Sequence, residues 1–322
     1  MTRRPDDSAP RIISLGSINA DFAVRAEEVP SGPGAILAHD LLRTSGGKAA
    51  NVAVLARRLG APASLLACVG DDDLADQALA GPRAEDVDLT GVRRRPGPTA
   101  YSSITVPRDG AKSIVLALNA NDEWADDADA VRDDVRGAPA GSVVVVDLEV
   151  PELLARAALE AAREQNLTTV LDPAPPQRLD EELLALADHV IPDHQEAEQL
   201  TDVDTESIEG AERAAAQLRE RGARTAHVKL ADGGCVTASP EGVWIVEAPD
   251  DVEVVDATGA GDAFAGGLSW ALLMGEPVER AAAIAVAAAT CAVTAYGSQE
   301  SYPSLAALRS MAERVVATSR GS

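Results

Sequence analysis

The 322-residue sequence predicts an α/β fold, in which a mostly parallel β-sheet is accompanied by a small second sheet. Residues 143–147 form a near-continuous apolar run, which is typical of a strand buried on both faces of a parallel sheet. Strand-like runs of this kind alternate with helical ones along most of the chain. Two strand pairs, in residues 20–45 and 97–118, have no covering helix, and this predicts the separate small sheet. We expect one domain over residues 1–322, with residues 1–10 as a flexible tail.

The composition is that of a globular protein, with 46% hydrophobic and 25% charged residues. Because aromatic residues make up only 2% of the chain, the core must be built mainly from Ala, Val and Leu. The formal net charge of −24 repels nucleic acids and anionic membranes, which argues against both as partners. The three cysteines form no Cys-x-x-Cys pair and the four histidines show no metal-ligand spacing, which indicates reduced thiols and no zinc site.

The chain has no apolar run of the about 18 residues that a membrane helix needs. Its longest apolar run, residues 281–295, is expected to be a buried helix. The first ten residues are not followed by an apolar signal region, so we expect a cytoplasmic protein.

The first predicted strand, residues 11–16, is followed by the polar residues Asn19 and Asp21. In open α/β sheets, ligands bind beyond the carboxyl ends of the strands. Asn19 and Asp21 are two residues apart, so in an extended chain both side chains point to the same side. Their donor and acceptor groups suit adjacent sugar hydroxyls, although a role in forming a turn would also explain them.

A pair of glycines precedes the next predicted helix, which runs through Leu59. Gly46 and Gly47 allow the backbone to approach a ligand closely. Lys48 supplies a cation, and Asn51 lies one helical turn further on. The alternative is a solvated helix N-terminus. The pattern is not a P-loop, which requires a hydroxyl residue directly after the lysine.

The middle of the chain continues the alternation of strands and helices. A core strand is predicted at residues 63–69, and Asp72 or Asp73 is expected to cap the helix that follows. The acidic residues 122–134 have a helical period and are expected to form a solvated face. Glu149 follows the apolar run described above and therefore lies at the ligand end of that strand.

The strongest chemical pattern lies in residues 254–264. Val254 and Val255 are expected to end a strand, after which Gly259-Ala260-Gly261 form a tight turn and Asp262 opens an apolar helix. The turn and the helix N-terminus direct free N–H groups and a positive dipole at one point, which suits a phosphate oxygen. Asp262 beside this cradle can accept a proton from an attacking hydroxyl. The alternative is a Gly-rich connection in which Asp262 only starts the helix.

Residues 256–262, Asp-Ala-Thr-Gly-Ala-Gly-Asp, resemble the C-terminal signature of the PfkB (ribokinase-like) carbohydrate kinases. The earlier Gly-Gly-Lys-Ala-Ala-Asn is similar to the N-terminal signature of the family, with Ala49 in place of a glycine. The resemblance extends over residues 12–305. It implies a doubly wound α/β core with helices on both faces, and a β lid that covers the sugar and often forms a dimer interface.

The resemblance also implies roles for individual residues. Sugar binding is implied for Asn19, Asp21, Gly47, Lys48, Asn51, Glu149 and Asp262. Phosphoryl transfer is implied for Gly259, Ala260, Gly261 and Asp262, with the last as the catalytic base. Nucleotide binding is implied for Asp193, Lys229, Ala231, Gly234 and Gly261.

Two kinds of cation are implied as well. Glu196 matches the family residue that orders Mg²⁺-bound waters around the phosphates. A monovalent cation, K⁺, is implied at Asp256, Thr258, Ala295, Gly297 and Ser301. Besides Ala49, three positions depart from the family pattern, because Asn119 and Ala231 each replace a glycine and Asp193 replaces an asparagine. Asp193 adds negative charge near the triphosphate, although a helix cap would also explain it.

The implied function is that of an ATP-dependent sugar kinase, which transfers the γ-phosphate of ATP to a primary hydroxyl of a pentose. The ribokinase branch of the family is the most similar, which implies conversion of D-ribose to ribose 5-phosphate. Another sugar or a nucleoside remains open as the acceptor, and Tyr101, Ser103 and Val115 in the lid are expected to select it. A non-catalytic sugar-sensing protein is the second alternative. A homodimer that assembles through the lid is also implied.

Overall fold

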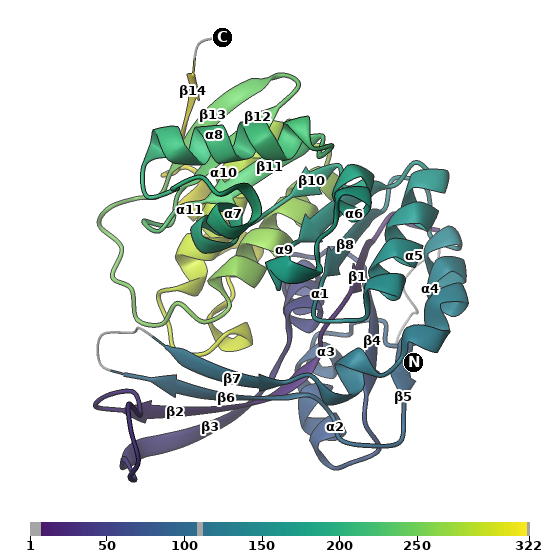
Figure 1. Ribbon diagram of the computed structural model, residues 1–322, viewed down its shortest axis with the longest axis vertical. Coiled ribbons are helices and arrows are strands. Elements are labelled where there is room, and N and C mark those ends of the chain that lie inside the picture. The colour runs from purple at the N-terminus through teal and green to yellow at the C-terminus, as the bar shows by residue number, and fades with distance from the viewer. Residues whose placement is uncertain (1–7, 108–111, 321–322) are drawn as a thin grey trace.

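The computed structural model describes residues 8–107 and 112–320 and contains two β-sheets (Figure 1). Residues 1–7 of the expected flexible tail lie outside the described residues. The larger sheet has ten strands. In spatial order they are β14 (Val316–Arg320), β13 (Gly242–Glu247), β12 (Cys235–Ser239), β11 (Thr225–Lys229), β10 (His189–Val190), β9 (Thr168–Asp172), β8 (Val143–Asp147), β1 (Ile12–Leu15), β4 (Ala63–Val69) and β5 (Val92–Arg94).

The strand pairings confirm a mostly parallel, doubly wound sheet. Every neighbouring pair from β11 to β5 is parallel, whereas β12, β13 and β14 pair antiparallel at one edge. The strand order reverses at β1, which has β4 on one side and β8 on the other. Ligands of such sheets bind in the crevice at this switch point, beyond the carboxyl ends of the strands.

Helices cover both faces of the large sheet, as expected (Figure 1). Neighbouring strand residues point to opposite faces, so Ile12 packs with α1, α9 and α10, whereas Ile13 packs with α4 and α5. The first face carries α1 (Lys48–Arg58), α9 (Ala260–Leu273), α10 (Val278–Ala292) and α11 (Leu305–Ala312). The second face carries α4 (Ala128–Arg136), α5 (Glu152–Glu164), α6 (Glu181–Leu186), α7 (His194–Thr201) and α8 (Ile208–Glu220). Short elements complete the described chain: α2 (Leu74–Ala78), α3 (Ala80–Ala84), η1 (Asn119–Asp122), η2 (Ala125–Asp127), η3 (Pro176–Arg178) and η4 (Gln299–Ser301).

Small residues let the helices of the first face pack closely, as the composition predicts. A Cβ atom added to Gly267 of α9 would lie 2.7 Å from the Cβ atom of Ala288 in α10. Similarly, a Cβ atom on Gly266 would lie 2.9 Å from a methyl group of Leu55 in α1. Helix α9, which carries the predicted catalytic residue, is therefore held rigidly between its neighbours.

The four-stranded small sheet lies below the large one in Figure 1 and joins the two strand pairs that the sequence predicts. Its central strands are parallel, and each outer strand is antiparallel to its neighbour. In spatial order the strands are β3 (Ala38–Gly46), β2 (Asn19–Ala26), β6 (Tyr101–Val106) and β7 (Ser113–Ala117).

Two local predictions are wrong. Val254 and Val255 end no strand, because β13 stops at Glu247 and both valines lie exposed in irregular chain. Neither Asp72 nor Asp73 caps α2 with its side chain. Asp73 has helical backbone angles, which point its carboxylate away from the helix N–H groups, and Asp72 instead accepts hydrogen bonds from the N–H and hydroxyl of Thr99.

The acidic segment at 122–134 is helical only in part, because two 3₁₀ turns precede α4. No helix of the described residues is long and apolar enough to cross a membrane.

Candidate active site

A cavity of about 520 Å³ opens at the switch point, between the large sheet and the small one. The start of β2, the start of α1 and Glu149, just beyond the end of β8, supply part of its wall. The starts of α7 and α9, the turn between β11 and β12 and the inner face of the small sheet supply most of the remainder. All the residues predicted to bind sugar, phosphoryl group or nucleotide line this cavity.

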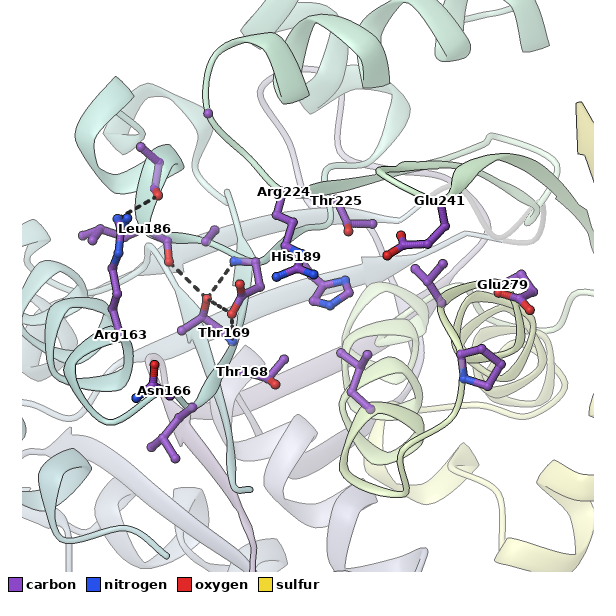
Figure 2. Close-up of a pocket in the computed structure, with 18 residues that line it drawn as sticks. Arg163, Asn166, Thr168, Thr169, Leu186, His189, Arg224, Thr225, Glu241 and Glu279 are labelled. Atoms are coloured by element: carbon purple, nitrogen blue, oxygen red, sulfur yellow. Dashed lines mark hydrogen bonds between the residues drawn. The ribbon is translucent and has the colours of Figure 1, made fainter. Parts of the chain in front are cut away.

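A larger hollow, of about 760 Å³, lies at the opposite edge of the sheet (Figure 2). Thr168, His189 and Thr225 line it at the amino-terminal ends of three parallel strands. None of the predicted site residues reaches it. Because ligands of this fold class bind at the carboxyl ends of the strands, the smaller cavity is the candidate active site.

The predicted anion cradle is present at the start of α9. Gly259 has a φ of 77°, and a Cβ atom there would lie 2.8 Å from the Cβ atom of Ser298, so only glycine fits. The N–H groups of Gly261 and Asp262 have no hydrogen-bond acceptor among residues 8–107 and 112–320. These donors and the positive end of the helix dipole therefore converge on the cavity, as an anion requires.

The carboxylate of Asp262 lies at the rim of this cradle and is held by two other predicted residues. Asn51 Nδ2 donates to Asp262 Oδ2 at 2.6 Å, and Lys48 Nζ lies 3.8 Å from Oδ1. Asp262 is 9% exposed and lines the cavity, so it can reach a bound ligand.

Lys48 is paired with an additional carboxylate that the sequence did not single out as a site residue. Its Nζ atom donates to Asp172 Oδ2 at 3.3 Å. Burial by itself would lower the pKa of Lys48, but the carboxylates of Asp172, Asp262 and Glu149 outweigh it and hold this pKa well above its ordinary value. Lys48 is therefore a permanent cation at the centre of the site.

Asn19 and Asp21 point into the cavity from β2, and each is held by a residue from another strand or turn. Asp21 Oδ1 accepts a hydrogen bond of 2.5 Å from Ser102 Oγ. Asn19 Oδ1 accepts one of 2.8 Å from Asn121 Nδ2. Burial raises the pKa of Asp21 to about 7, against the hydrogen bond from Ser102, which lowers it.

The sequence analysis missed Ser102 and Asn121 as site residues, although one signal for Asn121 was present. Asn119 has a φ of 43°, a left-handed conformation that asparagine tolerates better than most residues. Asn119 can therefore take the place of the glycine with which the family pattern begins the turn Gly-Ala-Asn, here Asn119-Ala120-Asn121. This turn places Asn121 where its amide also accepts from the N–H of Ile18 at 3.2 Å.

Glu149 lines the cavity beyond the end of β8. Burial raises its pKa, whereas Lys48 and a hydrogen bond from Ser17 lower it. Its neighbour Asp147 accepts hydrogen bonds from the N–H groups of Ser17 and Glu149. Asp147 therefore ties the end of β8 to the turn that follows β1.

On the nucleotide side, Asp193 and Glu196 form a capping box at the start of α7. Asp193 Oδ1 accepts from the N–H of Glu196, and Glu196 Oε2 accepts from the N–H of Asp193, each at 2.8 Å. The helix-cap explanation of Asp193 therefore agrees with the structure. Lys229, Ala231 and Gly234 line the same part of the cavity.

The donor set near Glu196 fits a metal that is bound through water. The described residues hold no cluster of three or more His, Cys, Asp or Glu side chains that could ligate a metal directly. However, Asp172 Oδ1 is buried without a hydrogen-bond partner in the described part of the chain. Carboxylate oxygens of this kind suit the waters of a Mg²⁺ ion that is carried by phosphates.

The residues predicted for K⁺ lie next to the cradle, and three of them are joined by hydrogen bonds. The buried carboxylate of Asp256 accepts from the N–H groups of Thr258, at 2.8 Å, and Gly297, at 3.0 Å. Thr258 Oγ1 is buried with no partner among the described residues. A buried carboxylate and an unsatisfied hydroxyl fit a monovalent cation, and Ala295 and Ser301 flank the same loop.

The prediction about the lid residues is wrong, because it chose the opposite face of the strands. Tyr101, Ser103 and Val115 are exposed and do not line the cavity. The neighbouring residues on the same two strands line the cavity instead: Ser102, Ile104, Ile114 and Leu116. Side chains alternate along a strand, so a choice that is wrong by one residue selects the other face.

Comparisons with known proteins show which family the chain resembles. A family model described as pfkB family carbohydrate kinase matches residues 9–305. Ribokinase of Haemophilus influenzae is 32% identical and the match covers 90% of this chain and 94% of that protein. Deoxyribokinase of Salmonella typhi is 29% identical, with coverage of 91% and 96%.

A solved structure of Arabidopsis thaliana ribokinase complexed with ribose and ATP superimposes with a TM-score of 0.81. It is 26% identical in sequence, and the match covers 95% of this chain and 99% of that one. With the cradle, the acid beside it and the polar pair on the small sheet in one cavity, the chain belongs to the pfkB family of carbohydrate kinases.

Proposed function

We propose that this protein transfers the γ-phosphate of ATP to the primary hydroxyl of a pentose, and that D-ribose is converted to ribose 5-phosphate. The observation that carries the proposal is the arrangement of the cavity. A sugar-binding pair, Asn19 and Asp21, faces a phosphate cradle that has one carboxylate, Asp262, at its rim. The similarity to ribokinases supports D-ribose as the acceptor.

In the proposed mechanism, sugar hydroxyls bind to Asn19, Asp21 and Glu149 and thereby orient the primary hydroxyl toward Asp262. Asp262 Oδ1 or Oδ2 accepts the proton as the sugar oxygen attacks the γ-phosphorus and the bond to the ADP oxygen breaks. Asn51 keeps the carboxylate in place through its 2.6 Å hydrogen bond. The N–H groups of Gly261 and Asp262, together with Lys48, stabilise the negative charge on the transferred group.

Two cations complete the proposal. Glu196 and Asp172 would hold, through water, the Mg²⁺ ion that offsets the charge of the triphosphate. Asp256, Thr258, Ala295, Gly297 and Ser301 would hold K⁺ beside the cradle. K⁺ would then keep the loop that carries Thr258 in place, so we expect activity to rise when K⁺ is added.

A second acceptor, 2-deoxyribose, is favoured by one observation. The deoxyribokinase of Salmonella typhi is nearly as similar to this chain as the ribokinases are. Ile104, Ile114 and Leu116 wall the cavity where the acceptor would lie, and such apolar groups do not require a further hydroxyl. Nucleosides and hexoses are less well supported, and a protein that only senses sugar has no need of the cradle.

The test is an assay of ADP release with Mg²⁺-ATP over D-ribose, 2-deoxyribose, hexoses and nucleosides, each with and without K⁺. We expect the highest kcat/KM with D-ribose and a higher rate with K⁺. Asp262→Asn should lower kcat by about 10³-fold, because a positioned base contributes on that scale, while the melting temperature changes little. No ADP release with any acceptor would support the sensing alternative, and near-normal turnover of Asp262→Asn would remove this residue as the base.

We also infer that the protein forms a homodimer through the outer face of the small sheet. Leu41, Tyr101 and Val115 share this face and are 59%, 38% and 65% exposed. A second copy that covers them would remove a large apolar patch from water. We expect Val115→Glu to convert a dimer to a monomer in light scattering, and a wild-type protein that is already monomeric would contradict the proposal.

A further inference from the structure

The distribution of the basic residues sets the candidate active site apart from the rest of the molecule. The chain has three lysines, Lys48, Lys112 and Lys229, and 25 arginines supply the rest of the 28 Lys and Arg residues. All three lysines line the 520 Å³ cavity, whereas none of the arginines of the described residues does. The chemistry of the site, and not the general surface charge, therefore accounts for where lysine occurs.

The roles of two of these lysines follow from the contacts already described. Lys48 is paired with Asp172 and Asp262. The ammonium group of Lys229 lies 3.6 Å from the position that a Cβ atom on Gly261 would take, beside the cradle. Lys112 has not been assigned a role, and it comes from the small sheet.

Lys112 directly precedes β7 of the small sheet, and its side chain reaches the loop that precedes α9 on the large sheet. Its Nζ atom donates to the backbone oxygen of Ala257 at 3.2 Å. Ala257 begins the turn that leads into the cradle at residues 259–262. The ammonium group of Lys112 therefore lies beside the loop that leads into the anion site.

The surroundings of Lys112 differ from those of Lys48 in one respect. Lys48 has carboxylate partners within 4 Å, whereas Lys112 contacts only a neutral carbonyl among the described residues. An ammonium group has three donors, and one of them is used here. Asp262, Asp256 and Asp21 are near enough to raise the pKa of Lys112, but burial is the larger effect and lowers it.

Removing a cation partly from water costs free energy, and this cost is offset only when an anion binds beside the cation. The anion that the cradle is built to hold would lie next to it. We infer that Lys112 is a ligand of the γ-phosphoryl group of bound ATP and stabilises that group during its transfer to the sugar. This inference rests on the proposed function.

The placement of Lys112 also links the two reactants. Asp21 and Ser102, which belong to the small sheet, line the sugar side of the cavity, and Lys112 extends from the same sheet to the phosphate side. One structural unit would therefore position the sugar and the transferred group relative to each other. Such positioning accounts for much of the acceleration in phosphoryl transfer.

The competing explanation is that Lys112 only fastens the small sheet to the backbone at Ala257. The two roles predict different effects of removing the ammonium group. A ligand of the γ-phosphate strengthens binding of ATP but not of ADP, whereas a fastener affects both nucleotides equally or alters sugar affinity.

The experiment measures, by titration calorimetry with Mg²⁺ and saturating D-ribose, the affinities of ADP and of a non-hydrolysable ATP analogue with a methylene bridge before the γ-phosphate. The variants are Lys112→Met, Lys112→Arg and Arg25→Met. Arg25 lies in β2 of the same sheet, pairs with Asp40 and does not line the cavity. Its replacement removes the same unit charge and serves as the matched control.

We expect Lys112→Met to weaken binding of the ATP analogue by about 10-fold or more relative to ADP, because a hydrogen bond to a charged group contributes a factor of this size to the affinity. The kcat/KM for ATP should fall by about 10- to 100-fold. Lys112→Arg should recover part of both losses, and Arg25→Met should show neither.

Equal weakening of the analogue and ADP, or a loss of sugar affinity alone, would assign the fastening role and overturn the inference. Unchanged affinities and rates in Lys112→Met would overturn it as well. If the wild-type protein phosphorylates no acceptor, the proposed function fails, and the calorimetric comparison then reports separately on whether Lys112 contacts a γ-phosphate.

Discussion

The two sheets of this protein differ in how far their faces are buried. The parallel part of the ten-stranded sheet is covered on both faces, and its strand β8 is buried at all five positions, although the edge strand β14 is exposed. In the four-stranded sheet one face lines the cavity and the other carries exposed apolar residues, of which Leu41 and Val115 are 59% and 65% exposed. Burial therefore stabilises the large sheet by itself, whereas the small sheet depends on what binds to each of its faces.

The difference also divides the proposed chemistry. The large sheet and its helices supply most of the groups that act on phosphate, since Asp262 and the cradle lie at the start of the buried helix α9. Lys112, which directly precedes β7, is the one phosphate ligand that we assign to the small sheet. The small sheet supplies Asn19, Asp21 and Ser102, the polar groups that would select the sugar. Changes in the small sheet should therefore alter specificity and assembly more than folding.

The largest effect that tests this comparison is on stability. Leu55 of α1 is fully buried against Gly266 of α9, so Leu55→Ala should lower the free energy of unfolding by about 2–5 kcal/mol. The same substitution at Leu41, on the outer face of the small sheet, should change it by about 0.5 kcal/mol or less. Urea titration at a concentration where the chain is monomeric measures both values, and equal losses would show that the small sheet is part of the same core.

The next effect concerns the ionisation of Asp21. Its pKa rises from 3.8 to about 7 on folding, so the folded state binds the proton more tightly than the unfolded state does. Ionisation therefore opposes folding: the penalty is absent below pH 4, grows between pH 4 and 7, and is complete above pH 7. Asp21→Asn removes it and should stabilise the ligand-free protein by up to about 4 kcal/mol at pH 8, since each pKa unit corresponds to about 1.4 kcal/mol.

The check is the free energy of unfolding of both proteins from pH 4 to pH 8, without sugar. At pH 4 the two proteins should differ little, because Asp21 is neutral in the folded state and only partly ionised in the unfolded state. A stability difference that does not vary with pH would show that the carboxylate is ionised in the folded protein throughout this range.

The smallest of these effects concerns the junction of the two regions. Gln299 Nε2 donates to Asn51 Oδ1 at 2.8 Å and to Ser45 Oγ, in β3, at 3.3 Å. Because Asn51 Oδ1 accepts the hydrogen bond from Gln299, the Asn51 amide is held with its Nδ2 facing Asp262. Gln299→Glu keeps the shape but removes the donor, and kcat should fall by about 10-fold with little change in the KM for sugar.

Steady-state kinetics with D-ribose measure this change. Gln299→Met, which cannot accept a hydrogen bond as a carboxylate does, separates loss of the donor from introduction of a charge. An unchanged kcat in both variants would show that Asn51 keeps its orientation without Gln299.

Much of the fold could be predicted from the sequence because the signals are local. Continuous apolar runs marked β4 and β8 with their observed boundaries. The apolar run at residues 281–295 also marked a buried helix, although α10 begins and ends three residues earlier, at Val278–Ala292. The expectation that Val255 ends a strand was wrong, because two β-branched residues cannot specify a strand without a neighbouring strand to pair with.

The residues of the candidate site also differ in whether local sequence alone could predict them. The cradle and Asp262 are encoded within a few consecutive residues, where a turn and a helix start determine the geometry. By contrast, Asn121 lies 102 residues from its partner Asn19, and Lys112 lies 145 residues from Ala257. Only strand pairing and the docking of the small sheet bring such residues together, and only the register of β6 and β7 decides which of their side chains face the cavity.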